Sequence, residues 1–229
     1  MTAASRAPAS SNPRRARKQR LAGKLAAMLA VLLVSVDSQA HPHAWIDVES
    51  TIVLSSDGVI AAIEETWVFD ELYTAGLMEE IASDGRPQQA ALGKFAARVI
   101  EDLGPYGYFM RVTADGRPVR LAAVTQFKSE MKGRQLSLSF TAPLDELADP
   151  KRHAVQFSVF DPSYFIKMTH RPEAPPSFKN DAEHHCRARV QQPDPSPESI
   201  LRAFSLDRGA TPQDDLGQLF AEKVYIQCG

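Results

Sequence analysis

The first 40 residues decide where the folded part of this chain begins. Six basic residues between Arg14 and Lys24 precede a short apolar run, "LAAMLAVLLVSV", and Ser38 and Ala40 are small residues at −3 and −1 of a cleavage site. This order is typical of a secretory signal peptide, and the apolar run is shorter than the roughly 20 residues of a transmembrane helix. We predict cleavage after Ala40, export to the periplasm, and membrane contact only through the leader before cleavage. An uncleaved membrane anchor is the alternative.

The predicted mature chain, residues 41–229, has the size of a single domain with its own hydrophobic core. Seven of the 26 Lys and Arg residues and one of the 28 Asp and Glu residues lie in the leader, which leaves the mature chain with a formal charge of −8. An acidic chain is not expected to bind nucleic acid. It suits an exported protein that meets cations.

The chain has two cysteines, Cys186 and Cys228, and both lie near its C-terminal end. An exported compartment is oxidising, so an even pair predicts a disulfide. This bond would close a loop of about 40 residues and would typically stabilise the fold by about 2–4 kcal/mol. The alternative is a pair of thiolate metal ligands.

Hydrophobic periodicity predicts strands at residues 45–54 and 59–69, joined by the turn "SSDG". Apolar spacing then predicts two helices, over 70–82 and 88–103. Further strands are expected in "YFMRVTADGRPVRLAAV", "TQFKSEMKGRQLSLSFTAPL", "HAVQFSVFD" and, at a sheet edge, "HHCRARVQQ", and "DPSPESI" indicates a helix start. We therefore predict an α+β fold, a single domain rich in antiparallel β-sheet with two or more helices packed on one side. No glycine-rich phosphate loop supports a Rossmann fold.

Cleavage after Ala40 would place two histidines at the new N-terminus, in "HPHAWID". In an extended chain the side chains of His41 and His43 point the same way, about 6.6 Å apart, and can converge on one ion. Asp47 lies further along the same face. Pro42 has no N–H, so the square-planar copper or nickel site that uses a deprotonated second amide cannot form normally. The alternative is a frayed terminus without a ligand.

Other side chains must complete such a site. The strongest candidates are Asp161, in "FDPSYF", and His184 of the His184–His185 pair, whose members point to opposite faces if they lie in a strand. His170 and Asp70 are weaker candidates. An aspartate before proline is also a common turn residue, so Asp161 has a structural alternative.

Four stretches, "HPHAWID", "ETWVFDELYT", "FDPSYF" and "FAEKVYIQC", resemble the domain of unknown function 1007 family. Its members are exported bacterial proteins, often described as periplasmic components of an uncharacterised ABC-type transport system. The resemblance implies an association with nickel, cobalt or zinc permeases. His41, His43 and Asp47 match the family's opening motif, and Asp161 matches its late Asp-Pro motif. The family implies no catalytic residue.

Three functions follow from these observations. The first is a periplasmic metal-binding accessory protein of a zinc, nickel or cobalt transport system, which is not an enzyme and whose partners are the ion and an inner-membrane metal permease. Zinc is the expected ion, with nickel, cobalt and copper as alternatives. The second is a copper-dependent exported enzyme with an N-terminal histidine clamp. The third is a metal-free module that docks onto a permease through exposed aromatic residues.

Overall fold

The computed structural model describes residues 42–83, 85, 88–205 and 215–229. The predicted leader and His41 lie outside these ranges, so the cleavage prediction stays a prediction. Residues 39–229 group into one compact unit. Within the described ranges, no helix combines the length and the apolar character needed to cross a membrane.

The predicted N-terminal hairpin is present as β1 (Ala44–Leu54) and β2 (Ile60–Phe69), which pair antiparallel. Buried residues alternate with more exposed ones along β1, as expected of a strand with one face on the core. Gly58 in the connecting turn has a φ of +79°, a conformation that glycine adopts without a steric penalty. Alternation and turn chemistry thus fix the register of this hairpin.

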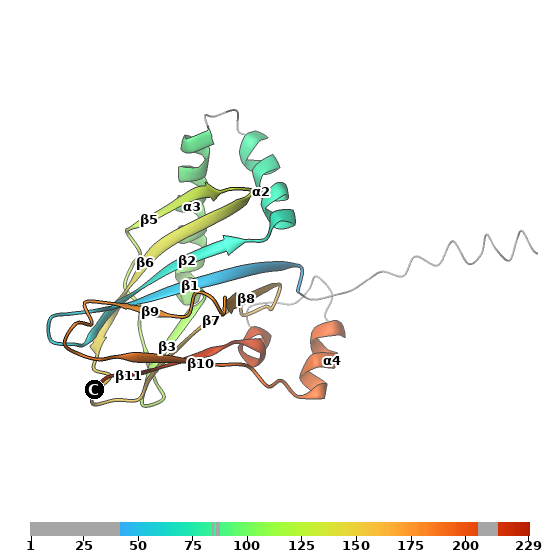
Figure 1. Cartoon of the computed structure of the whole chain (residues 1–229). Helices are drawn as coiled ribbons and strands as arrows, with labels where there is room; N and C mark the ends of the chain where they lie inside the picture. The colour runs from blue at the N-terminus through green and yellow to red at the C-terminus, as the bar shows by residue number, and fades with distance from the viewer. Residues whose placement is uncertain (1–41, 84, 86–87, 206–214) are drawn as a thin grey trace, which may run out of the picture. The chain divides into compact units, whose positions relative to one another are not determined.

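A six-stranded sheet is built around the hairpin, in the order β5-β6-β2-β1-β8, with β9 also pairing with β1 (Figure 1). The strands β8 and β9 run parallel to β1, and the other pairs are antiparallel. The added strands are β5 (Phe127–Lys132), β6 (Gln135–Ala148), β8 (Ile166–His170) and β9 (Ser177–Lys179).

The remaining strands form a second, five-stranded antiparallel sheet, where the sequence predicted only one sheet. Its order is β10-β11-β7-β3-β4, so β10 is the predicted edge strand. A disulfide joins Cys186 and Cys228, as predicted, beside the ends of β10 and β11. The bounds are β3 (Met110–Ala114), β4 (Arg117–Val119), β7 (Val155–Val159), β10 (Arg187–Gln191) and β11 (Lys223–Gln227).

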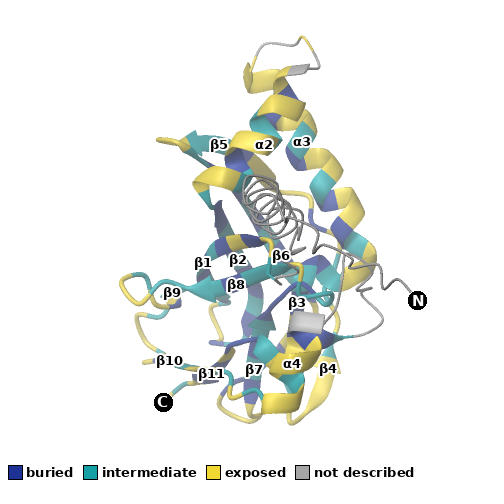
Figure 2. Cartoon of the chain, turned by 90° about the vertical axis from the view of Figure 1, so that its right-hand side faces the viewer, coloured by how far each residue is buried: buried dark blue, intermediate teal, exposed yellow. Residues whose placement is uncertain are grey.

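Both predicted helices are present, as α2 (Glu71–Ser83) and α3 (Gln88–Leu103). They cover the inner face of the six-stranded sheet near β5 and β6, where the Ser129 hydroxyl donates to the Leu92 carbonyl at 2.6 Å (Figure 1). The outer surfaces of these helices are largely exposed (Figure 2). The other helical elements are α4 (Pro197–Ser205) and two 3₁₀ segments, η1 (Gly104–Phe109) and η3 (Leu216–Phe220).

One hydrophobic cluster joins the two sheets and α3. Trp67 is 2% exposed at its centre and packs edge-to-face on Phe140, with ring centroids 5.1 Å apart. The second sheet contributes Phe157 and Val224 from its inner face. The fold is therefore α+β, as predicted, with a core enclosed between two sheets and a helical layer.

Asp70 connects this core to the start of β1. Its Oδ1 accepts the Tyr73 N–H at 2.8 Å, which caps α2, and its Oδ2 accepts the Trp45 N–H at 2.9 Å. We expect Asp70→Ala to lower the free energy of unfolding by about 1–2 kcal/mol, because two backbone N–H groups lose their acceptors. Urea unfolding measures this, with the exposed Glu146→Ala as a control that removes the same charge. Equal stability of both variants would contradict the capping role.

Candidate functional site

The first predicted metal ligand that the structure describes, His43, stands at the beginning of β1. Its backbone N–H donates to the carbonyl of Phe165 at 2.8 Å, and its ring centroid lies 4.8 Å from that of Phe165. The side chain is exposed. The backbone that carries the imidazole is therefore fixed, while the imidazole itself faces the surface. His41 lies outside the described residues.

Asp161 lies in the loop that leads into β8, at the same end of the six-stranded sheet, because Ala44 and Ile166 are paired in register. The side chain is only 5% exposed. Its Oδ1 accepts the Ser163 N–H at 2.9 Å, its Oδ2 accepts the Ile166 N–H at 3.0 Å, and the Ser163 hydroxyl donates to the same carboxylate. These bonds explain the buried carboxylate without a metal ion, and they shape the loop beside His43.

The structure places the other two predicted ligands apart from His43. Asp47 lies four residues along β1, about 13 Å away at 3.3 Å per residue. His184 lies beyond the far end of β1, a strand about 36 Å long, where its ring packs on Gly58 so closely that a Cβ there would lie 2.6 Å from Nδ1. His184 therefore belongs to the turn before β10 and does not share a site with His43.

Within the ranges that the structure describes, no group of three or more His, Cys, Asp and Glu side chains is arranged to hold a metal ion. A site at the predicted mature N-terminus would therefore need His41, its amino group, or ligands from outside the chain, in addition to His43. Exposed imidazole is chemically suited to Zn²⁺, Ni²⁺ and Co²⁺. The prediction that these residues bind a metal stays a prediction.

Sequence reasoning missed a second constellation, a chain of polar side chains buried in the core. Ser50 of β1 faces Glu65 of β2 in register, and the Ser50 hydroxyl is hydrogen bonded to Glu65 Oε1 at 2.7 Å. The Trp67 indole N–H donates to Glu65 Oε2 at 3.2 Å. Ser50 and Glu65 are 3% and 1% exposed. Both oxygens of a deeply buried carboxyl group are thus satisfied by side chains of the same sheet.

This series of buried polar side chains continues toward the second sheet through His170, the last residue of β8. Its Nε2 lies 2.9 Å from the Ser50 hydroxyl, and its Nδ1 lies 2.8 Å from Glu222 Oε2. Glu222, just before β11, also accepts the His170 backbone N–H at 2.8 Å and the Gln192 amide at 2.7 Å. We call this set the buried polar chain; its members are Trp67, Glu65, Ser50, His170, Glu222 and Gln192.

The two carboxyl groups of the buried polar chain are shifted in opposite directions. Burial raises the pKa of Glu65 from 4.5 to about 8, and the hydrogen bonds from Ser50 and Trp67 oppose this only in part. Burial also acts to raise the pKa of Glu222, but the hydrogen bonds from His170 and Gln192 outweigh it and lower that pKa. At neutral pH Glu65 is therefore mostly protonated and Glu222 ionised.

Ser50, His170 and Glu222 are linked in the order of a serine-hydrolase triad. The serine, however, is 3% exposed and its hydroxyl is also bonded to a protonated carboxyl group. A substrate carbonyl has no access to this oxygen in the described conformation. The arrangement therefore supports a structural role, and the absence of an enzymatic activity stays a prediction.

The sequence contains a signal for the buried polar chain. Period-2 alternation places Ser50 between Val48 and Ile52, and Glu65 between Ile63 and Trp67, on faces that are otherwise apolar. Polar side chains at core positions of a strand require buried partners. The pattern alone does not show which partners they find, because the pairing of β1 with β8 is not local.

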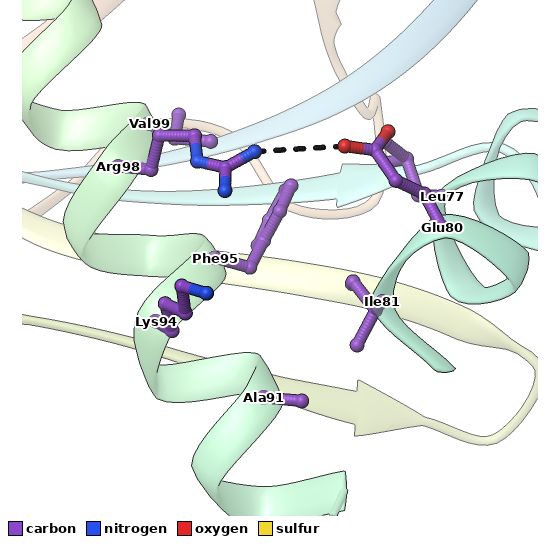
Figure 3. Close-up of a pocket in the computed structure, with 8 residues that line it drawn as sticks. All are labelled: Leu77, Glu80, Ile81, Ala91, Lys94, Phe95, Arg98 and Val99. Atoms are coloured by element: carbon purple, nitrogen blue, oxygen red, sulfur yellow. Dashed lines mark ion pairs between the residues drawn. The ribbon is translucent and has the colours of Figure 1, made fainter. Parts of the chain in front are cut away.

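A hollow of about 350 Å³ lies between α2 and α3 (Figure 3). Arg98 and Glu80 form an ion pair of 3.6 Å across it, as the dashed line shows. The rest of the lining is apolar apart from Lys94, and the pair is well exposed. This composition suits the packing gap of a helical pair rather than a site for chemistry; the apolar lining residues are Leu77, Ile81, Ala91, Phe95 and Val99.

Comparison with known proteins places the chain in a family. A family model described as "Protein of unknown function (DUF1007)" matches residues 26–228. The chain belongs to the DUF1007 family. A relative from Haemophilus influenzae, described as an uncharacterized protein, is 23% identical over 208 residues, which cover 90% of this chain and 99% of the relative. No solved structure matches. Membership of DUF1007 confirms the resemblance and assigns no activity.

The raised pKa of Glu65 generates a pH-dependent stability. Between pH 4.5 and about 8 the folded chain keeps a proton on Glu65 that the unfolded chain has lost. The contribution of Glu65 to the free energy of unfolding is therefore complete below pH 4.5 and is lost as the pH rises through about 8. We expect Glu65→Gln, which keeps a neutral hydrogen-bonding group, to remove this decline and to be relatively more stable at pH 8 than at pH 5. Urea unfolding across pH 4–9 measures the difference.

The control for this experiment is Glu64→Gln, on the outer face of the same strand, where the carboxylate pairs with Lys179. It makes the same substitution at the neighbouring position, on the face of β2 away from the core. Identical pH profiles for wild type and Glu65→Gln would show that Glu65 is ionised in the folded chain.

Ser50 joins the two halves of the buried polar chain. We expect Ser50→Ala to lower the free energy of unfolding by about 1–3 kcal/mol, because Glu65 and His170 each lose a partner inside the core. The control is Ser139→Ala, whose hydroxyl bonds Thr66 on the outer face of the sheet and is expected to cost less. Thermal and urea unfolding compare the two, and a smaller loss for Ser50→Ala than for Ser139→Ala would contradict the linking role.

Proposed function

We propose that this protein is an exported, metal-binding accessory component of a transition-metal transport system. In this proposal it binds zinc, nickel or cobalt through His41 and His43 at the mature N-terminus, in the periplasm, and exchanges the ion with an inner-membrane permease. The observation that carries the proposal is the position of His43, an exposed imidazole on a backbone that is hydrogen bonded to Phe165, just before β8. A fixed backbone at His43 lowers the ordering cost of a metal site that uses its imidazole.

Apolar side chains around this end of β1 support the permease as a partner. Trp45 is 50% exposed, Leu72 85% and Phe165 37%. These residues belong to segments that meet here, since the Trp45 N–H bonds Asp70 and the Phe165 carbonyl accepts the His43 N–H. Exposed aromatic residues are frequent anchors of protein interfaces. The proposed ion site would thus lie at the edge of a docking surface.

Asp161 has a positioning role in this proposal. Its carboxylate holds the loop that carries Phe165 and so orients the start of β1. The ion would be held by imidazole groups, with the terminal amine or a ligand from the permease completing its shell. An incomplete shell of this kind suits transfer of an ion rather than permanent storage.

The proposal is tested with the mature chain, beginning at His41 and made by export without an N-terminal tag. Calorimetric titration with Zn²⁺, Ni²⁺, Co²⁺ and Cu²⁺ is expected to show one ion bound per chain, with binding lost in His41→Ala/His43→Ala. Binding is also expected to weaken as the pH falls through about 6.5, where imidazole takes up a proton.

The matched control is His184→Ala/His185→Ala, which removes two histidines beyond the opposite end of β1. We expect it to bind metal like the wild type. Equal binding by the wild type and the His41→Ala/His43→Ala variant would refute the proposed site. Tight Cu²⁺ binding without Zn²⁺ binding, together with peroxide-driven turnover, would support the copper-enzyme alternative instead.

A further inference from the structure

The five-stranded sheet differs in charge from the rest of this acidic protein. All of its strands are described, and they contain five cationic residues and neither Asp nor Glu, although the whole chain has 28 acidic and 26 basic residues. Alternation places four of the cations on the outer face, away from the core. One of these, Arg111, is neutralised by Asp215 at 3.1 Å. The other three are Arg187, Arg189 and Lys223.

The outer face is hollowed where β10 and β11 meet the turn before β7. A cleft of about 440 Å³ is lined there by Arg187, Arg189 and Tyr225 on one side, and by Pro150 and His153 on the other. This volume lies within the usual range for small-molecule sites, about 300–1,000 Å³. The cleft lies beside the disulfide. It is beyond the C-terminal end of β1, whereas His43 stands at the N-terminal end.

The two arginines of this cleft are arranged to act together. They lie two residues apart on one strand, so their side chains leave the same face about 6.6 Å apart. The Arg189 guanidinium carbon lies 4.7 Å from the centroid of the Tyr225 ring, which holds that side chain against the sheet. A ligand with two anionic groups fits between such a pair, because each guanidinium can bind a carboxylate or phosphate bidentately.

The two arginines have no acidic partner in the part of the chain that the structure describes. Among the described residues, neither Arg187 nor Arg189 is paired with a carboxylate. The acid beside the cleft, Asp115, is engaged by His153 at 2.7 Å and by the Ala154 N–H at 2.8 Å, contacts that lower the pKa of Asp115. Two adjacent like charges without partners repel each other, so a bound anion would relieve that repulsion.

The covalent frame of the cleft is rigid. Cys186 directly precedes Arg187 and Cys228 directly follows β11, so the disulfide fixes the strand ends that form the cleft. The edge position of β10 leaves its outer side chains open to solvent. The two guanidinium groups are therefore presented from a preorganised backbone, which lowers the entropic cost of binding.

We propose that this cleft binds a small multivalent anion of the carboxylate or phosphate class. Arg187 and Arg189 hold the anionic groups, and Tyr225 supports the second guanidinium and contributes a flat apolar wall. This site is separate from the proposed metal site and does not depend on it.

The test is calorimetric titration of the mature, disulfide-bonded chain at low ionic strength with citrate, pyrophosphate and inorganic phosphate. We expect citrate or pyrophosphate to bind, and Arg187→Gln/Arg189→Gln to weaken this binding at least tenfold. The charge-matched control is Arg98→Gln/Arg134→Gln, at exposed positions on α3 and the β5–β6 turn, which is expected to bind like the wild type. Unfolding curves verify that both variants fold.

Three results would overturn the proposal. One is the absence of binding to all three anions, and another is equal weakening in both double variants, which would reflect net charge alone. The third is binding only to vesicles that contain anionic phosphatidylglycerol, because the basic face would then contact a membrane surface rather than a small ligand. Co-sedimentation with such vesicles provides this last measurement.

Discussion

The buried polar chain is the interaction on which the arrangement of the two sheets depends. It begins at Trp67 and Glu65 in the six-stranded sheet and reaches Glu222, next to the first residue of β11 in the other sheet, and Gln192 beyond it. Carboxyl and imidazole groups in an apolar core are tolerated only when their hydrogen bonds are satisfied. Because those bonds cross the core, a relative shift of the sheets would leave several groups unsatisfied at once, whereas apolar contacts alone would permit sliding.

Strand β1 connects all the features that bear on function. His43 stands at its start, Ser50 lies in its middle, and the turn after it contacts His184, beside the disulfide. The strand pairs with β2, β8 and β9, so it is held along its whole length. A strand anchored in this way separates the proposed metal site from the anion cleft, and each can be altered without disturbing the other.

Local signals predicted much of the fold. Alternation and turn residues predicted the hairpin of β1 and β2, helical spacing predicted α2 and α3, and an even pair of cysteines in a chain expected to be exported predicted the disulfide. The division into two sheets was not predicted, because it depends on the parallel pairing of β1 with β8, more than 100 residues away in sequence. The buried polar chain was missed for the same reason. Ser50, Glu65 and His170 each resemble an ordinary polar strand residue until the register brings them together.

The opposite pKa shifts of Glu65 and Glu222 place a neutral acid near one end of the buried polar chain and a charged carboxylate near the other. Glu222 is ionised and only accepts hydrogen bonds, so His170 Nδ1 donates to it, while Nε2 lies 2.9 Å from the Ser50 hydroxyl. The Ser50 hydroxyl donates to Glu65 Oε1 and the Trp67 indole N–H to Oε2, but burial outweighs both bonds and keeps the carboxyl group mostly protonated at neutral pH. The neutral state of Glu65 thus depends on its burial between the two sheets, which makes the packing of the two sheets a condition for the neutral core.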